Sequence, residues 1–173
     1  MTKTSKERLV KSKIKRTWTD LRVEIQKLCI ALNISNDDFS EVNINEWREI
    51  ESNIWTNFSS KKNSRWIWET LANSYETAPF SHNNLELEEF ISPSEKVWIL
   101  LDEATHEKTK FWIYEGTVRA FDQLFRESFW TYEVLIVSKK YEWILILNHH
   151  STMIGTGILK DLITEFKRNG NNI

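Results

Sequence analysis

The segment 141–148, with the sequence YEWILILN, most constrains the fold because both of its alternating sets of side chains are largely apolar. Successive side chains of a β-strand point to opposite sides of a sheet. A strand that is apolar on both sides needs a covering layer on each face. The segment therefore predicts a central strand inside a covered sheet, and 96–102, with the sequence KVWILLD, repeats the pattern.

The spacing of the other apolar residues predicts the remaining elements. Helical periodicity favours amphipathic helices over 10–32 and 44–58, an inserted helix within 117–128 and a terminal helix over 159–168. Short β-branched and aromatic runs predict further strands at 110–116 and 131–137, the latter in a hairpin with 141–148. The run RWIWETL at 65–71 fits a strand or a short helix, the polar run 36–41 fits a connection, and 73–94 fits a long surface loop with at most a turn of helix.

Together these elements predict an α+β fold. We expect an antiparallel sheet of about four to six strands, flanked by the N-terminal helices, the inserted helix and the C-terminal helix. A single domain over 1–173 is expected, with 1–60 as a helical N-terminal layer and 94–173 as the strand-rich core.

The composition bears on the compartment. Cys29 is the one cysteine of the 173 residues, which excludes an internal disulfide and fits a reducing compartment. No apolar run follows the basic N-terminus, so no signal peptide is expected. Apolar runs such as VWILL are far shorter than the roughly 20 residues of a membrane span. We therefore expect a cytoplasmic protein that makes no membrane contact.

Charge is distributed unevenly along the chain. Residues 1–30 contain nine basic and three acidic residues, a local charge of +6, so a net charge of −2 leaves −8 for the rest. An acidic surface steers basic partners toward it, and aromatic anchors within a charged rim are typical of protein interfaces. The predicted partner-binding residues are Asp37, Asp38, Glu41, Trp55, Trp66, Trp68, Glu86, Glu88 and Glu89.

The run Asn148-His149-His150 is the candidate for catalysis or metal binding. On a continuing strand the two histidines point to opposite faces, whereas a turn would bring them together. Zinc needs three or four ligands, and His82 and His106 lie in distant segments, so neither a metal nor a cofactor is expected. As acid–base groups, His149 or His150 could act with a carboxylate, for which Asp102 is a candidate.

Gly155-x-Gly157 resembles part of a phosphate-binding loop. The third glycine of a dinucleotide fingerprint would fall at 160, where the chain has Lys160, and no βαβ unit surrounds the pair. A tight strand-to-helix turn is the interpretation we favour.

The stretch 131–157, TYEVLIVSKKYEWILILNHHSTMIGTG, resembles a family of small uncharacterised bacterial proteins. The resemblance covers about residues 97–157, through Trp143, His149, His150, Gly155 and Gly157, and it implies no activity. The layout of a small, tryptophan-rich α+β protein with an acidic surface also resembles the immunity proteins of bacterial polymorphic-toxin systems.

The leading hypothesis is a non-enzymatic protein that binds and neutralises a protein partner, such as a toxin with a basic surface. The alternative is a small hydrolase or nuclease-like enzyme that uses His149 or His150 with a carboxylate such as Asp102. A third hypothesis is nucleic-acid binding through the basic N-terminal helix. The acidic remainder of the chain would repel a polyanion, so nucleic acid is the partner we favour least.

Overall fold

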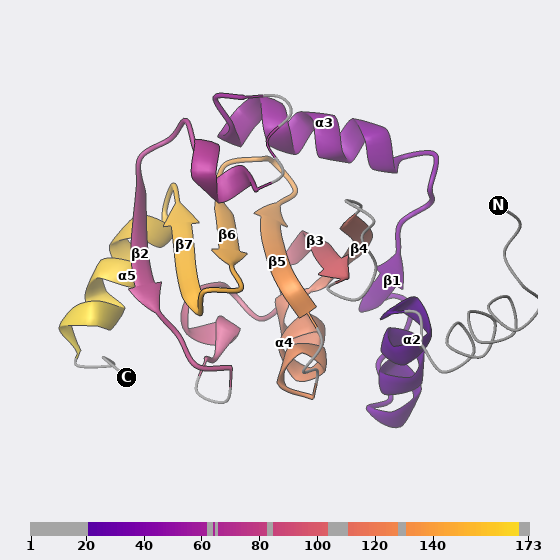
Figure 1. Cartoon of the computed structure of the whole chain (residues 1–173). Coiled ribbons are helices and arrows are strands. Elements are labelled where there is room, and N and C mark those ends of the chain that lie inside the picture. The colour runs from indigo at the N-terminus through magenta and orange to yellow at the C-terminus, as the bar shows by residue number, and fades with distance from the viewer. Residues whose placement is uncertain are drawn as a thin grey trace, which may run out of the picture.

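The computed structural model describes residues 21–61, 64, 66–82, 85–103, 111–127 and 131–169. These residues form one antiparallel sheet of seven strands in the order β1-β4-β3-β5-β6-β7-β2, together with four α-helices (Figure 1). The predicted α+β class is confirmed, with seven strands in place of four to six. The strands are β1 (Phe39–Glu41), β2 (Tyr75–Pro79), β3 (Lys96–Glu103), β4 (Phe111–Thr117), β5 (Thr131–Ser138), β6 (Ile144–Leu147) and β7 (Thr152–Thr156). The helices are α2 (Leu21–Ala31), α3 (Trp47–Phe58), α4 (Val118–Arg126) and α5 (Leu159–Arg168), with 3-10 helices η1 (Ile67–Thr70) and η2 (Leu87–Glu89).

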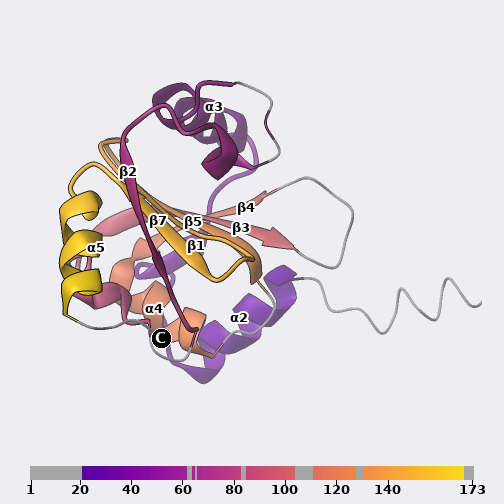
Figure 2. The same ribbon diagram turned by 60° about the vertical axis from the view of Figure 1, so that its left-hand side comes forward.

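Helices cover both faces of the sheet, as the central strand requires. α3 and η1 lie over one face, and α2, α4 and α5 lie over the other (Figures 1 and 2). All four residues of β6 are buried, which is why YEWILILN is apolar in both alternating sets. The two N-terminal helices α2 and α3 thus cover opposite faces of the sheet.

Each central strand contributes alternate side chains to two separate cores. Within β5, Ile136 packs into the core under α2, α4 and α5, whereas Leu135 packs into the core under α3. Because the pairing aligns Leu135 with Leu100 of β3 and Ile146 of β6, the same alternation holds across the sheet. A slip of one residue would exchange the two sets, so the register is strongly specified.

The two strands missed by the sequence analysis lie at the edges of the sheet. β1 falls in the polar run 36–41 and β2 in the expected loop 73–94, so those interpretations were wrong for 39–41 and 75–79. An edge strand is short and partly exposed, so it carries no continuous apolar pattern. β1 has three residues, and β2 ends in Pro79, a residue tolerated at sheet edges.

The outer edge of β2 is shielded against pairing with another strand. Phe80 donates its N–H to the Ser151 carbonyl, so by alternation the N–H of Thr77 points away from β7. That N–H donates instead to the carboxylate of Glu76, which also binds Lys167 of α5. Pro79 has no N–H to offer at the next outward position.

One described helix, α3, begins later than predicted. α3 begins at Trp47, and Ile44, which was assigned to its apolar face, is 63% exposed. α2 ends at Ala31, after which Asn33 has a φ of 54°, the left-handed conformation that terminates helices. The predicted residues 10–20 of this helix lie outside the described residues. The ambiguous segment 65–71 contains the 3-10 helix η1.

The glycine pair connects β7 to α5. A Cβ at Gly155 would lie 2.8 Å from Cβ of Leu159, which cannot rotate away, so the close packing of α5 on the strand favours glycine. Gly157 has a φ of 59°, which L-residues rarely adopt. This geometry is that of a tight strand-to-helix turn.

Candidate functional site

The turn between β6 and β7 brings the two histidines together. The side-chain oxygen of the buried Asn148 accepts the backbone N–H of His150 and of Thr152, each at 3.0 Å. Ser151 takes a φ of 55°, which reverses the chain. The rings of His149 and His150 consequently lie side by side, with centroids 4.0 Å apart, instead of on opposite faces of a strand.

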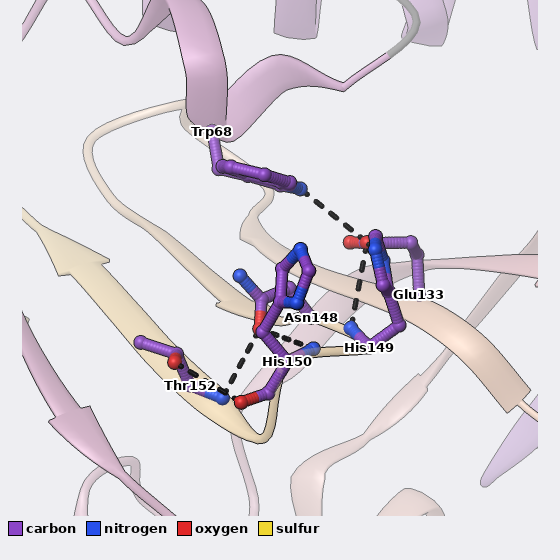
Figure 3. Close-up of polar contacts among 6 residues, drawn as sticks. All are labelled: Trp68, Glu133, Asn148, His149, His150 and Thr152. Atoms are coloured by element: carbon purple, nitrogen blue, oxygen red, sulfur yellow. Dashed lines mark hydrogen bonds and ion pairs between the residues drawn. The ribbon is translucent and has the colours of Figure 1, made fainter.

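Glu133 of β5 lies against this turn and was not singled out in the sequence. Its side chain is 1% exposed, and its Oε1 lies 2.5 Å from Nδ1 of His149. The same oxygen accepts the indole N–H of Trp68 at 3.3 Å (Figure 3). Burial raises the pKa of Glu133, and the hydrogen bonds from His149 oppose that rise. The turn is therefore built around a buried carboxylate.

The raised pKa of Glu133 leads to a test by pH. Above the ordinary value of 4.5 the unfolded chain loses this proton while the folded chain keeps it, so rising pH disfavours folding. The contribution of Glu133 to stability is complete below pH 4.5 and is lost as the pH rises through the pKa that Glu133 has in the folded protein. We expect the free energy of unfolding of the wild type, minus that of Glu133→Gln, to fall as the pH rises above 4.5 and through the raised pKa of Glu133. Urea denaturation of both proteins measures this difference, and a difference that rises with pH would contradict the assignment.

Two tryptophans complete the site on the η1 side. The Trp66 ring centroid lies 5.4 Å from that of His149, and the Trp68 centroid lies 5.7 Å from that of His150. Trp66, Trp68 and His149 are half-buried, and His150 is exposed. We call these four residues the Trp–His patch. It joins η1 to a turn about 80 positions further along the chain. Figure 3 shows three of its residues, Trp68, His149 and His150, beside the carboxylate of Glu133.

The structure gives His149 a different carboxylate from the one considered in the sequence. Asp102 of β3 is buried and lies directly across from Glu133 in the strand pairing, so both side chains leave the sheet on the η1 side. The carboxylate in contact with His149 is nevertheless Glu133. A lone acidic residue within the apolar strand TYEVLIV was the signal that could have identified it.

The other predicted partner-binding residues lie apart from this patch. The acidic residues Glu86, Glu88 and Glu89 are exposed on and beside η2, which packs on α4 under the opposite face of the sheet. Their neighbours on α4 partly neutralise them, because Arg126 lies 3.6 Å from Glu86 and Arg119 lies 3.4 Å from Glu88.

The second acidic group lies around β1, and the remaining tryptophan lies in the core. Asp37, Asp38 and Glu41 are exposed, and Glu41 lies 3.8 Å from Arg22 of α2. Trp55 of α3 is 9% exposed and packs against Phe111 of β4. Of the predicted residues, the structure therefore brings Trp66 and Trp68 together with His149 and His150.

Two further expectations concern metals and membranes. Within the described ranges, no group of three or more His, Cys, Asp and Glu side chains is arranged to hold a metal ion. His106 lies outside those ranges. No helix of the described part of the chain is long and apolar enough to cross a membrane.

The fold and the site define a class of protein: an antiparallel sheet covered on both faces, with a histidine–carboxylate pair beneath tryptophans at one turn. Within that class, the chain belongs to DUF6756, a family of unknown function whose model matches residues 17–167. This match extends well beyond residues 97–157, over which the sequence resembles an uncharacterised family. Neither the curated proteins nor the solved structures gave a match.

Proposed function

We propose that this protein acts by binding another protein and that the Trp–His patch is the centre of the recognition surface. The observation that supports it is the convergence of Trp66, Trp68, His149 and His150 at one surface position. Tryptophan is among the residues most enriched at the energetic centres of protein interfaces, where it supplies apolar area with a polar edge. Half-buried rings are already held in place, so less side-chain entropy is lost on binding.

The acidic residues then have a secondary role. Carboxylates that are exposed and already paired with arginines contribute little binding energy, but they shape the field that guides a basic partner to the surface. This role fits the resemblance to immunity proteins. We therefore propose a cytoplasmic bacterial protein that neutralises a toxin or regulates another protein with a basic surface.

Replacing Trp68 by alanine is the test of the patch. A partner captured from the organism that encodes this chain is identified, purified and titrated against the wild type and each variant. We expect Trp68→Ala to weaken binding by about 30-fold or more, as for an interface hot spot. Tyr75→Ala removes an exposed ring at the β2 edge, outside the patch, and should change the affinity by less than about threefold.

Because Trp68 also bonds the buried Glu133, its loss can disturb the local structure. His150→Ala is the companion variant, since His150 is exposed and its replacement leaves the Glu133 contacts in place. Thermal unfolding of each variant confirms that it is folded. Folded Trp68→Ala and His150→Ala proteins that bind the partner as tightly as the wild type would refute the proposal.

A second function is favoured by the contact between His149 and Glu133. A carboxylate that orients an imidazole is the arrangement used in acid–base catalysis, as the hydrolase alternative requires. In that case Glu133→Gln would abolish turnover of a substrate while leaving partner binding intact.

A further inference from the structure

The two oxygens of the Glu133 carboxylate have different surroundings. Oε1 lies 2.5 Å from Nδ1 of His149. The same oxygen accepts the indole N–H of Trp68 and, at 3.5 Å, the backbone N–H of His149. Oε2 is buried and has no hydrogen-bond partner among the described residues. A buried polar atom without a partner costs about 1–3 kcal/mol. Such an atom calls for an explanation, and the binding of a ligand that donates a hydrogen bond is one.

The rings near this carboxylate indicate the chemistry of that ligand. In Figure 3 the Glu133 carboxylate extends from β5 toward the rings of Trp68 and His150. Aromatic faces attract cations, and tryptophan does so most strongly. A carboxylate repels anions and forms strong hydrogen bonds with a cationic ligand that has N–H donors. The combination selects a cation that carries N–H groups.

Among such cations, guanidinium fits this site better than a metal ion or an ammonium group. Within the described residues, no three His, Cys, Asp or Glu side chains are arranged to hold a metal ion. A lysine ammonium is compact and strongly hydrated, whereas a guanidinium is planar, stacks on aromatic rings and donates to carboxylate oxygens in its own plane. Guanidinium can therefore meet the rings and Oε2 at the same time.

We infer that Oε2 of Glu133 and the rings of Trp68 and His150 form a binding site for an arginine side chain of the protein partner. This inference rests on the proposed function for the origin of that arginine. His150 is exposed at the rim of the site, so its ring can turn aside without uncovering the core. The single arginine would satisfy the buried oxygen and anchor the basic surface of the partner.

Protons should compete with the arginine. Burial raises the pKa of Glu133, and the ionisable groups that face it are His149 and His150 of the turn and Asp102 of β3. A guanidinium stabilises the ionised carboxylate and so displaces a proton from it. Binding should therefore tighten as the pH rises, with release of a proton that calorimetry in buffers of different ionisation enthalpy detects.

The test uses N-acetylarginine amide as the probe, titrated into the full-length protein at about pH 8, where an ordinary imidazole is uncharged. The indole N–H resonance of Trp68 reports binding. We expect a saturable shift with the arginine probe and at least about tenfold weaker binding of N-acetylcitrulline amide, its neutral counterpart. Equal binding of the two probes, or no saturation with arginine, would overturn the inference.

Two variants distinguish binding at this site from attraction by the surface charge in general. Glu133→Gln keeps an acceptor for Trp68 and His149 but lacks the charge, and it should weaken the arginine probe by at least about tenfold. Glu69→Gln removes an exposed carboxylate from η1, the 3-10 helix that carries Trp68, and should leave the affinity for the arginine probe unchanged. An unchanged affinity in folded Glu133→Gln would refute the arginine site.

The partner itself distinguishes the two proposals. If Trp68→Ala weakens binding of the partner and Glu133→Gln does not, the patch binds protein but the inferred arginine site is refuted. If the arginine probe binds and Trp68→Ala leaves the partner unaffected, the cation site stands and the proposed recognition surface fails.

Discussion

Replacing Ile136 by alanine is expected to lower the free energy of unfolding by about 2–5 kcal/mol. Ile136 lies in β5 and is 0% exposed. It pairs with Ile99 of β3 on one side and Leu145 of β6 on the other, beneath the layer of α2, α4 and α5. Alanine would leave a cavity where three central strands and a helical layer meet, and the paired strands cannot easily close it.

The matched control for this prediction is Ile158→Ala. Ile158 directly precedes α5 and is 65% exposed, so its truncation creates no cavity and should change stability by less than about 0.5 kcal/mol. Urea denaturation of both variants gives the two free energies. A loss below about 1 kcal/mol for Ile136→Ala would show that the two-sided core does not dominate stability.

The central part of this fold could be predicted because burial on both faces leaves a direct mark on the sequence. β6 is apolar in both alternating sets, and the amphipathic periods of α4 and α5 match the faces they bury. The edge strands β1 and β2 carry no such mark, since half of their environment is solvent. Their positions depend on pairing with β4 and β7, which a local pattern does not encode.

The candidate site shows the same division. The hairpin of β5 and β6 was predicted, and the register that pairs Val134 with Leu147 places Glu133 beside the Asn148–His149 turn. That contact was within reach of the sequence once the hairpin was accepted. Trp68 reaches Glu133 from 65 positions away through η1, whose placement depends on the packing of α3 on the sheet. Local spacing carries no information on such a contact.

Replacing Asp122 by alanine should destabilise the fold by about 2–4 kcal/mol, the second-largest loss of stability that we expect. Asp122 of α4 is 4% exposed, and its Oδ1 accepts the backbone N–H of Leu87 at 2.8 Å. Its Oδ2 binds Nε of Arg126, also at 2.8 Å. Alanine leaves the N–H of the buried Leu87 without a partner, and that desolvated donor accounts for most of the cost.

Asp122→Asn separates the hydrogen bond from the charge. The asparagine oxygen can still accept the Leu87 N–H, so the loss of stability should stay below about 1 kcal/mol, the size of a partly exposed ion pair with Arg126. Hydrogen exchange adds a local readout, since the Leu87 amide should lose protection in Asp122→Ala and keep it in Asp122→Asn. Equal losses of stability in the two variants would assign the effect to the ion pair instead. Because η2 carries Glu88 and Glu89, a loosened Leu87 would also release part of the acidic surface proposed to guide the partner.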